Sequence, residues 1–195
     1  MPPRQRRGRK RQEEERRTVL LVTNGRTTET AYFAGLGRHV DRKKYSVTSK
    51  FINGDPLTLT KDLKGDRWDL SAYTEVWIVV DHDGIDRQEF LKECRGLCSR
   101  RTVVHGIVSV PCFEVWLNAH YAPVRNYQNQ TEAQAHYRAL TGLSTKNLPA
   151  DFPWDAMSDA AHRCHLPTVS EPAIDTQGPC PSTTMPHLLR RLGLL

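Results

Sequence analysis

The chain has 195 residues, of which 38% are hydrophobic and 26% are charged, and its formal net charge is +6. This length fits one domain with enough apolar residues for a core. No run of 18 apolar residues occurs and no apolar segment follows the charged start, which excludes a membrane-spanning helix and a secretory signal. We therefore expect a soluble, cytoplasmic protein with no membrane partner.

The positive charge is concentrated at the start of the chain. Residues 1–17 hold eight of the 28 Lys and Arg residues but three of the 22 acidic residues, so the rest of the chain is close to neutral. We expect a disordered basic arm here, which either binds the phosphate backbone of nucleic acid or is a solvated tail. Both interpretations stay open. The candidate nucleic-acid-binding residues are Arg4, Arg6, Arg7, Arg9, Lys10 and Arg11.

Four segments in the first 110 residues have the patterns of strands. Residues 18–23, 75–80 and 103–110 are continuous apolar runs rich in β-branched residues, which favours strands buried on both faces of a parallel sheet. Residues 45–53 alternate in polarity and predict a further strand. A turn signal, Asn53-Gly54-Asp55-Pro56, follows this strand, and a short helix and a loop are expected before residue 75.

Helical patterns lie between and after the predicted strands. The fold class is therefore α/β, with a mostly parallel central sheet flanked by helices over residues 18–122. Residues 123–195 form a helical and loop part packed on that core, with an extended proline-rich loop over 166–182. The expected helices are 28–37, 85–98, one that opens at Pro111, 130–140, 154–165 and a last one that Thr183 caps, with Pro186 in its first turn.

Five cysteines are present, without the paired spacing of a zinc site. Buried reduced thiols are the favoured interpretation. Two histidines are also poor ligand candidates: His82 alternates away from its acidic neighbours, and His120 lies on an apolar helix stripe, as a core histidine does.

Polar clusters follow two of the predicted strands. Asn24-Gly25 leads to Thr28 and Glu29 after the first strand, and Asp81-x-Asp83 follows the strand over 75–80. In an open parallel sheet, ligands bind beyond the carboxyl ends of the strands. Asp81 and Asp83 are two residues apart on a backbone taken as extended, so their side chains would point the same way. Oxygen ligands favour Mg²⁺ or Mn²⁺; the alternative is a turn whose aspartates cap the helix near Ile85.

Four blocks of sequence carry a family resemblance. The first runs from Leu20 to Glu29 and on to Ala31-Tyr-Phe33, and the second is Val76-Trp-Ile-Val-Val-Asp-His-Asp83. The third is Pro111-Cys-Phe-Glu-Val-Trp-Leu117, and the last is Pro181-Ser-Thr-Thr184 with His187-Leu-Leu189. In this order, over residues 19–192, they resemble the motifs of the RloB family. The third block is the most specific of the four.

The RloB family is similar to Toprim proteins, so the resemblance implies a Toprim-like fold and phosphodiester chemistry on nucleic acid. Carried over residue by residue, Asp81 and Asp83 match a pair that holds Mg²⁺ (or Mn²⁺). Glu29 and Glu114 match two further acids of the family motifs, with roles in proton transfer. Such proteins occur in bacteria beside restriction–modification and phage-defence genes, often with a partner ATPase. The expected function is therefore a Mg²⁺-dependent nuclease on RNA, tRNA or DNA in antiphage defence, with a partner ATPase or a homo-oligomer.

Two positions depart from the family pattern. Asn24 stands where the pattern has glutamate, and Val110 replaces the asparagine before Pro111. An amide cannot transfer a proton at neutral pH, although its carbonyl oxygen can still bind a cation as a metal ligand. A catalytically degenerate protein that binds nucleic acid or an ATPase is therefore the alternative function. A nucleotide-binding phosphotransfer enzyme is a third hypothesis, against which the lack of a glycine-rich phosphate loop counts.

Overall fold

The computed structural model describes residues 15–65, 67–145 and 147–195. These residues form a five-stranded sheet in the order β2-β1-β3-β4-β5, in which the first four strands are parallel and β5 runs antiparallel to β4. The strands are β1 (Arg17–Thr23), β2 (Tyr45–Phe51), β3 (Glu75–Asp81), β4 (Val103–Val110) and β5 (Ser182–Thr183).

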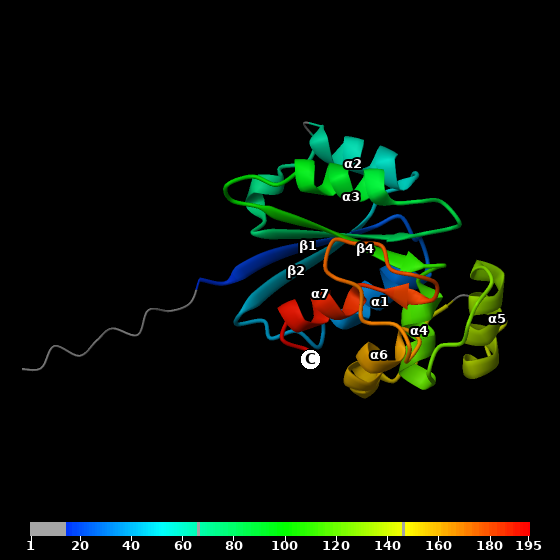
Figure 1. Cartoon of the computed structure of the whole chain (residues 1–195). Coiled ribbons are helices and arrows are strands. Elements are labelled where there is room, and N and C mark those ends of the chain that lie inside the picture. The colour runs from blue at the N-terminus through cyan, green and yellow to red at the C-terminus, as the bar shows by residue number, and fades with distance from the viewer. Residues whose placement is uncertain (1–14, 66, 146) are drawn as a thin grey trace, which may run out of the picture.

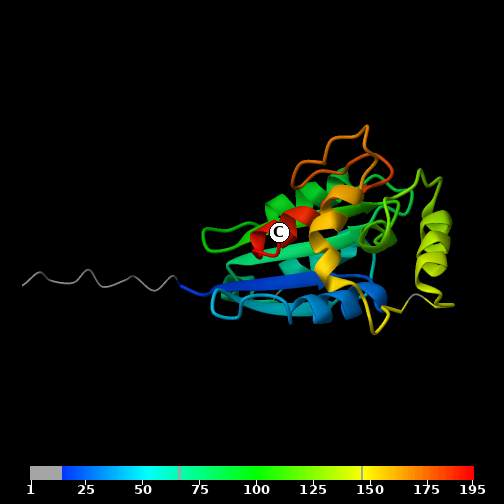
Figure 2. The same ribbon diagram turned by 90° about the horizontal axis from the view of Figure 1, so that it is seen from below.

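Helices cover both faces of this sheet (Figure 1). Two of them, α2 and α3, lie on one face, whereas α1, α4, α6 and α7 lie on the other and α5 packs outside α4 (Figures 1 and 2). The predicted α/β class with a mostly parallel sheet and a helical C-terminal part is confirmed. The helices are α1 (Thr28–Leu36), α2 (Pro56–Lys64), α3 (Gln88–Gly96), α4 (Glu114–Tyr121), α5 (Gln130–Thr141), α6 (Met157–Arg163) and α7 (Met185–Arg191), with short 3-10 turns at Leu70–Ala72 and Trp154–Ala156.

The strands sort their side chains between two cores. Along β1, Val19 and Leu21 face the core under α1 and α4, whereas Leu20 and Val22 face the core under α2 and α3. Because every second residue of a strand points to the same face, a continuous apolar run feeds both layers at once. The C-terminal helix α7 joins the first core through residues such as Leu188.

Several predicted boundaries are wrong in detail. The strand β1 begins at Arg17, inside the segment assigned to the arm, and α3 begins at Gln88 rather than at residue 85. Pro111 does not open α4: it lies in a turn after a cis peptide bond, and the helix begins at Glu114. The short strand β5, which pairs with the end of β4, had no signal in the proline-rich loop.

The cysteines are all free among the described residues, but two of the five, Cys98 and Cys180, are exposed rather than buried. The described residues also contain no helix long and apolar enough to cross a bilayer.

Candidate active site

The carboxyl ends of the parallel strands surround a pocket of about 310 Å³. Its lining comes from the loop after β1, the end of β3, the start of α4 and one side of α5. Five predicted site residues are in that lining. They are Asn24, Glu29, Asp81, Asp83 and Glu114, and the other described lining residues are Gly25, Arg26, Thr27, Thr28, Gln130 and Gln134.

Asp81 is the last residue of β3, where its side chain connects the strand to α4. Its Oδ1 accepts a hydrogen bond of 2.7 Å from the backbone N–H of Phe113, the residue before α4. Its backbone carbonyl accepts a hydrogen bond of 2.9 Å from Nε of the buried Arg87. Asp81 therefore satisfies a donor at the start of α4, not at the helix near Ile85 that the alternative interpretation named.

The pKa of the Asp81 carboxyl is well above its usual range. Burial is the main cause, because it disfavours the charged form, and the negative charges of Glu29, Glu114 and Asp83 raise the pKa further. The hydrogen bond from the Phe113 N–H acts in the opposite direction. Four carboxylates thus repel one another in this pocket, and a cation placed among them would relieve the repulsion.

Asp83 reaches the pocket by a different route from the one predicted. Its φ of 50° places it in the left-handed region, in a turn after the end of β3, so the assumption of an extended backbone is wrong. Its N–H donates to the carbonyl of Pro111 at 3.0 Å, which attaches the turn to the segment before α4. His82, between the two aspartates, is not in the described lining, as expected; its Nδ1 accepts a hydrogen bond from the N–H of Gly84.

Glu29 and Glu114 lie in the first turns of α1 and α4, where the helix dipole favours a negative charge. Glu114 is 4% exposed. The Glu29 carboxylate lies against Gly25: a Cβ on Gly25 would be 1.9 Å from Cδ of Glu29. The absence of a side chain at residue 25 is therefore what gives this carboxylate its place in the pocket.

Asn24, at the end of β1, uses its amide as a donor. Its Nδ2 donates a hydrogen bond of 3.3 Å to the carbonyl of Gly54, in the turn before α2. A carboxylate at this position has no proton to donate at neutral pH. The contact gives a structural reason for an amide here, and it leaves the side-chain oxygen as the atom with which Asn24 would serve a ligand.

No three His, Cys, Asp or Glu side chains within residues 15–65, 67–145 and 147–195 are arranged to hold a metal ion as they stand. The donor set nevertheless has the chemistry of a hard-cation site, since it offers carboxylate and amide oxygens and no described sulfur or imidazole in its lining. The nearby Cys112 is buried, and burial together with Glu114 and Asp81 raises the pKa of its thiol, so it stays protonated.

The remaining candidate residues from the sequence are not among the described lining residues of the pocket. The basic residues Arg4, Arg6, Arg7, Arg9, Lys10 and Arg11 lie outside the described residues. His120 is a core residue among aromatic rings, as predicted, with Nδ1 donating to the carbonyl of Trp116.

Three residues of the pocket lining were not predicted, namely Arg26, Gln130 and Gln134. The two glutamines are four residues apart, hence on one side of α5, but no signal in the sequence placed that side over the strand ends.

This arrangement defines a class of protein, namely an α/β protein with an acidic pocket at the carboxyl edge of a parallel sheet. Within that class, the chain belongs to the RloB-like protein family, whose model matches residues 19–192. Neither the search of curated proteins nor the search of solved structures found a match.

Proposed function

We propose that the protein is a Toprim-like nuclease that cleaves phosphodiester bonds of nucleic acid with the help of Mg²⁺ or Mn²⁺. One observation carries the proposal: four carboxylates from three separate segments, Glu29, Asp81, Asp83 and Glu114, line the same pocket at the sheet edge. Burial and the neighbouring negative charges disfavour the charged form of Asp81, and a divalent ion among these carboxylates would offset that effect.

In this proposal, Asp81 and Asp83 hold the ion, with the side-chain oxygen of Asn24 as a further ligand. Closing such a site requires side-chain rotation, which is open to Asp83 because it is exposed and to Glu29 because it is half-buried. A bound divalent ion polarises a phosphoryl oxygen and lowers the pKa of bound water. Membership of the RloB-like family and the oxygen-only donor set support this assignment.

The two glutamates supply proton transfer. A water oxygen attacks phosphorus, and its proton passes to Glu29 or Glu114. The bond from phosphorus to the leaving ester oxygen breaks as that oxygen takes up the proton from the protonated glutamate, which restores the carboxylate. Because Asn24 cannot transfer a proton and the two aspartates hold the ion, Glu29 and Glu114 are the carboxylates of the described lining left for this role. Loss of one general acid or base typically lowers the rate about 10²–10⁴-fold.

The cleavage experiment uses labelled RNA, tRNA and DNA with Mg²⁺ or Mn²⁺. We expect cleavage by the wild-type chain and its loss in Asp81→Asn and Asp83→Asn. Asp62→Asn is the matched control, because Asp62 is exposed on α2 and does not line the pocket. Absence of cleavage by the wild type, or cleavage that survives both site variants, contradicts the proposal.

The cellular setting is a proposal from the family resemblance. We propose antiphage defence in bacteria, with a partner ATPase or a homo-oligomer and with the basic arm on nucleic acid. Expression together with a partner ATPase should lower the plating efficiency of phage, and Asp81→Asn should abolish that effect. Equal plating with Asp81→Asn and with the wild type would separate the defence role from the acidic pocket.

A degenerate protein that binds nucleic acid without cutting it is the second candidate. The hydrogen bond from Asn24 Nδ2 to the Gly54 carbonyl favours it, because the amide has a structural use that a catalytic carboxylate would not have. Under this alternative the wild type binds but does not cleave, and Asn24→Glu creates cleavage. Cleavage by the wild type excludes it.

A further inference from the structure

The loop between β1 and α1 carries an arginine that is held at the pocket by an aromatic ring. Arg26 is exposed and lines the pocket, and its guanidinium carbon lies 5.4 Å from the centre of the Phe51 ring. Phe51 is the last residue of β2 and pairs in register with Thr23, at the end of β1. A cation over an aromatic face is attracted to it, and this contact restrains the guanidinium beside the acidic pocket.

Arg26 differs in charge from the acids around it. It is the cation in the part of the lining that the structure describes, where four carboxylates are also found. None of the ion pairs formed by the described residues includes Arg26. A guanidinium over a ring face can still donate its N–H groups to an acceptor.

A nucleic-acid strand that approaches four carboxylates meets repulsion at every phosphate. A guanidinium beside those carboxylates offsets this repulsion for one phosphate, and its planar fork of donors matches two phosphate oxygens. The contact with Phe51 reduces the side-chain freedom that Arg26 would otherwise lose on binding.

We infer that Arg26, seated on Phe51, binds a phosphate of the nucleic-acid strand next to the acidic pocket and thereby sets the position of that strand. The inference rests on the proposed function in taking nucleic acid as the ligand. It requires neither a bound metal ion nor catalysis, so it can be measured separately.

The experiment measures binding of a fluorescent single-stranded 20-nucleotide RNA or DNA to the full chain in EDTA, over a series of KCl concentrations. We expect Arg26→Gln to weaken binding about threefold to tenfold at low salt and to reduce the slope of log affinity against log salt by about 0.7, the value for one phosphate contact on a single strand. Phe51→Leu, which removes the ring but keeps an apolar side chain, should give a smaller loss of the same kind.

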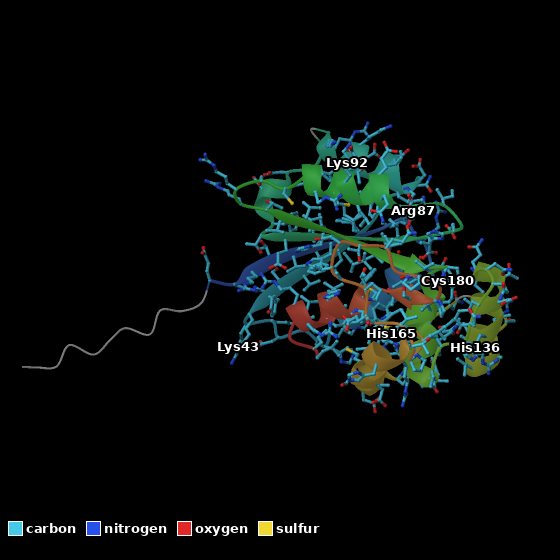
Figure 3. All side chains as sticks on the ribbon, viewed as in Figure 1. Lys43, Arg87, Lys92, His136, His165 and Cys180 are labelled. Atoms are coloured by element: carbon cyan, nitrogen blue, oxygen red, sulfur yellow. The ribbon has the colours of Figure 1, made fainter. Side chains whose placement is uncertain are left out.

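Arg95→Gln is the matched control. Arg95 is exposed in the last turn of α3, on the helix that carries Lys92 in Figure 3, on the sheet face covered by α2 and α3. Its affinity and salt slope should equal those of the wild type. A slope for Arg26→Gln that equals the slope of the wild type, or an equal fall in Arg95→Gln, overturns the inference.

Cleavage assays keep the two proposals apart. If the wild type cleaves, Arg26→Gln should raise KM by about the same factor as it weakens binding, with kcat changed less. If the wild type binds but does not cleave, the nuclease proposal fails, yet a lower salt slope in Arg26→Gln still supports the phosphate contact. If the wild type cleaves and Arg26→Gln is unchanged in KM and in slope, the phosphate contact is wrong and the nuclease proposal stands.

Discussion

At the scale of single residues, the glycine at position 25 leaves the space in which the Glu29 carboxylate lies. Gly25 has no side chain, and the space that a Cβ would occupy is filled by that carboxylate. We expect Gly25→Ala to fold, because the displaced group is the end of a flexible side chain, and to move the carboxylate out of its place. Cleavage should then fall by about 10²-fold or more, since a misplaced proton-transfer group loses most of its effect.

The control for this prediction is Gly96→Ala, at the end of α3, where a Cβ meets no atom within 4 Å. It should cleave like the wild type. Melting temperatures of the two alanine variants check that both fold. Full activity in Gly25→Ala would show that the position of Glu29 does not matter for cleavage.

His120 makes folding sensitive to acid. Burial lowers the pKa of its imidazole to about 4, whereas an unfolded chain takes up this proton near pH 6.5. Between these two pH values the unfolded state binds more protons than the folded state. The free energy of unfolding therefore increases as the pH rises through this range and decreases as the pH falls. The loss amounts to about 3 kcal/mol over the whole window.

Urea denaturation at pH 5 and pH 7.5 measures this loss. In His120→Phe, which keeps a ring among Tyr32, Trp116 and Phe152, the difference between the two pH values should shrink by about 2 kcal/mol. His162→Gln, at an exposed position of α6, should leave the difference unchanged. The prediction is wrong if His120→Phe keeps the pH dependence of the wild type.

At the scale of elements, a buried charge attaches the last helix to the sheet. The side chain of Glu75, at the start of β3, is 4% exposed and accepts a hydrogen bond of 2.7 Å from Nε of Arg191 in α7 and one of 3.3 Å from Nε1 of Trp77. Removing the arginine leaves a buried carboxylate without its main partner. Arg191→Gln should therefore lower the free energy of unfolding by about 2 kcal/mol.

A double-mutant cycle with Glu75→Gln separates the pair from its surroundings, and we expect a coupling energy above about 1 kcal/mol. The pair Lys64–Glu93 between α2 and α3 is the matched control, and we expect a weaker coupling there because solvent screens it. Equal coupling energies in the two cycles would mean that burial of Glu75 does not strengthen its ion pair with Arg191.

Elements whose pattern depends on local chemistry were predictable. The run over 103–110 became β4 without a shift, because its mostly apolar and β-branched residues suit a strand with helices on both faces. Asp83 was harder: the positive φ of its turn, and the hydrogen bond that attaches this turn to Pro111, depend on a segment 28 residues away along the chain. The start of α4 was predicted at Pro111 for a different reason. A proline after a strand fits a turn as well as the first turn of a helix, and the sequence does not distinguish the two.

At the scale of the whole molecule, parallel strands bring distant residues together. Glu29 and Asp81 are 52 positions apart, and both were predicted for the site because strand ends of one parallel sheet share an edge. The pairing of Arg26 with Phe51 and the place of Gln134 on the pocket were beyond prediction. They depend on the order of the strands and on how α5 packs outside α4, which no local pattern encodes.

The acidic pocket lies at one end of the sheet. Arg87 lies at the carboxyl ends of the strands near the acidic pocket, whereas Lys43 lies at the far end with the start of β1 (Figure 3).

Mn²⁺ binding followed by electron paramagnetic resonance tests most directly whether Asp81 and Asp83 hold a divalent ion in the acidic pocket. The wild-type chain at pH 7.5 should bind Mn²⁺, and Asp81→Asn should weaken this binding at least about tenfold, while Asp62→Asn leaves it unchanged. Affinity of the wild type should also rise with pH, because the ion competes with a proton whose pKa on Asp81 is raised. Mn²⁺ binding that is absent in the wild type, or equally strong in Asp81→Asn, would contradict this assignment.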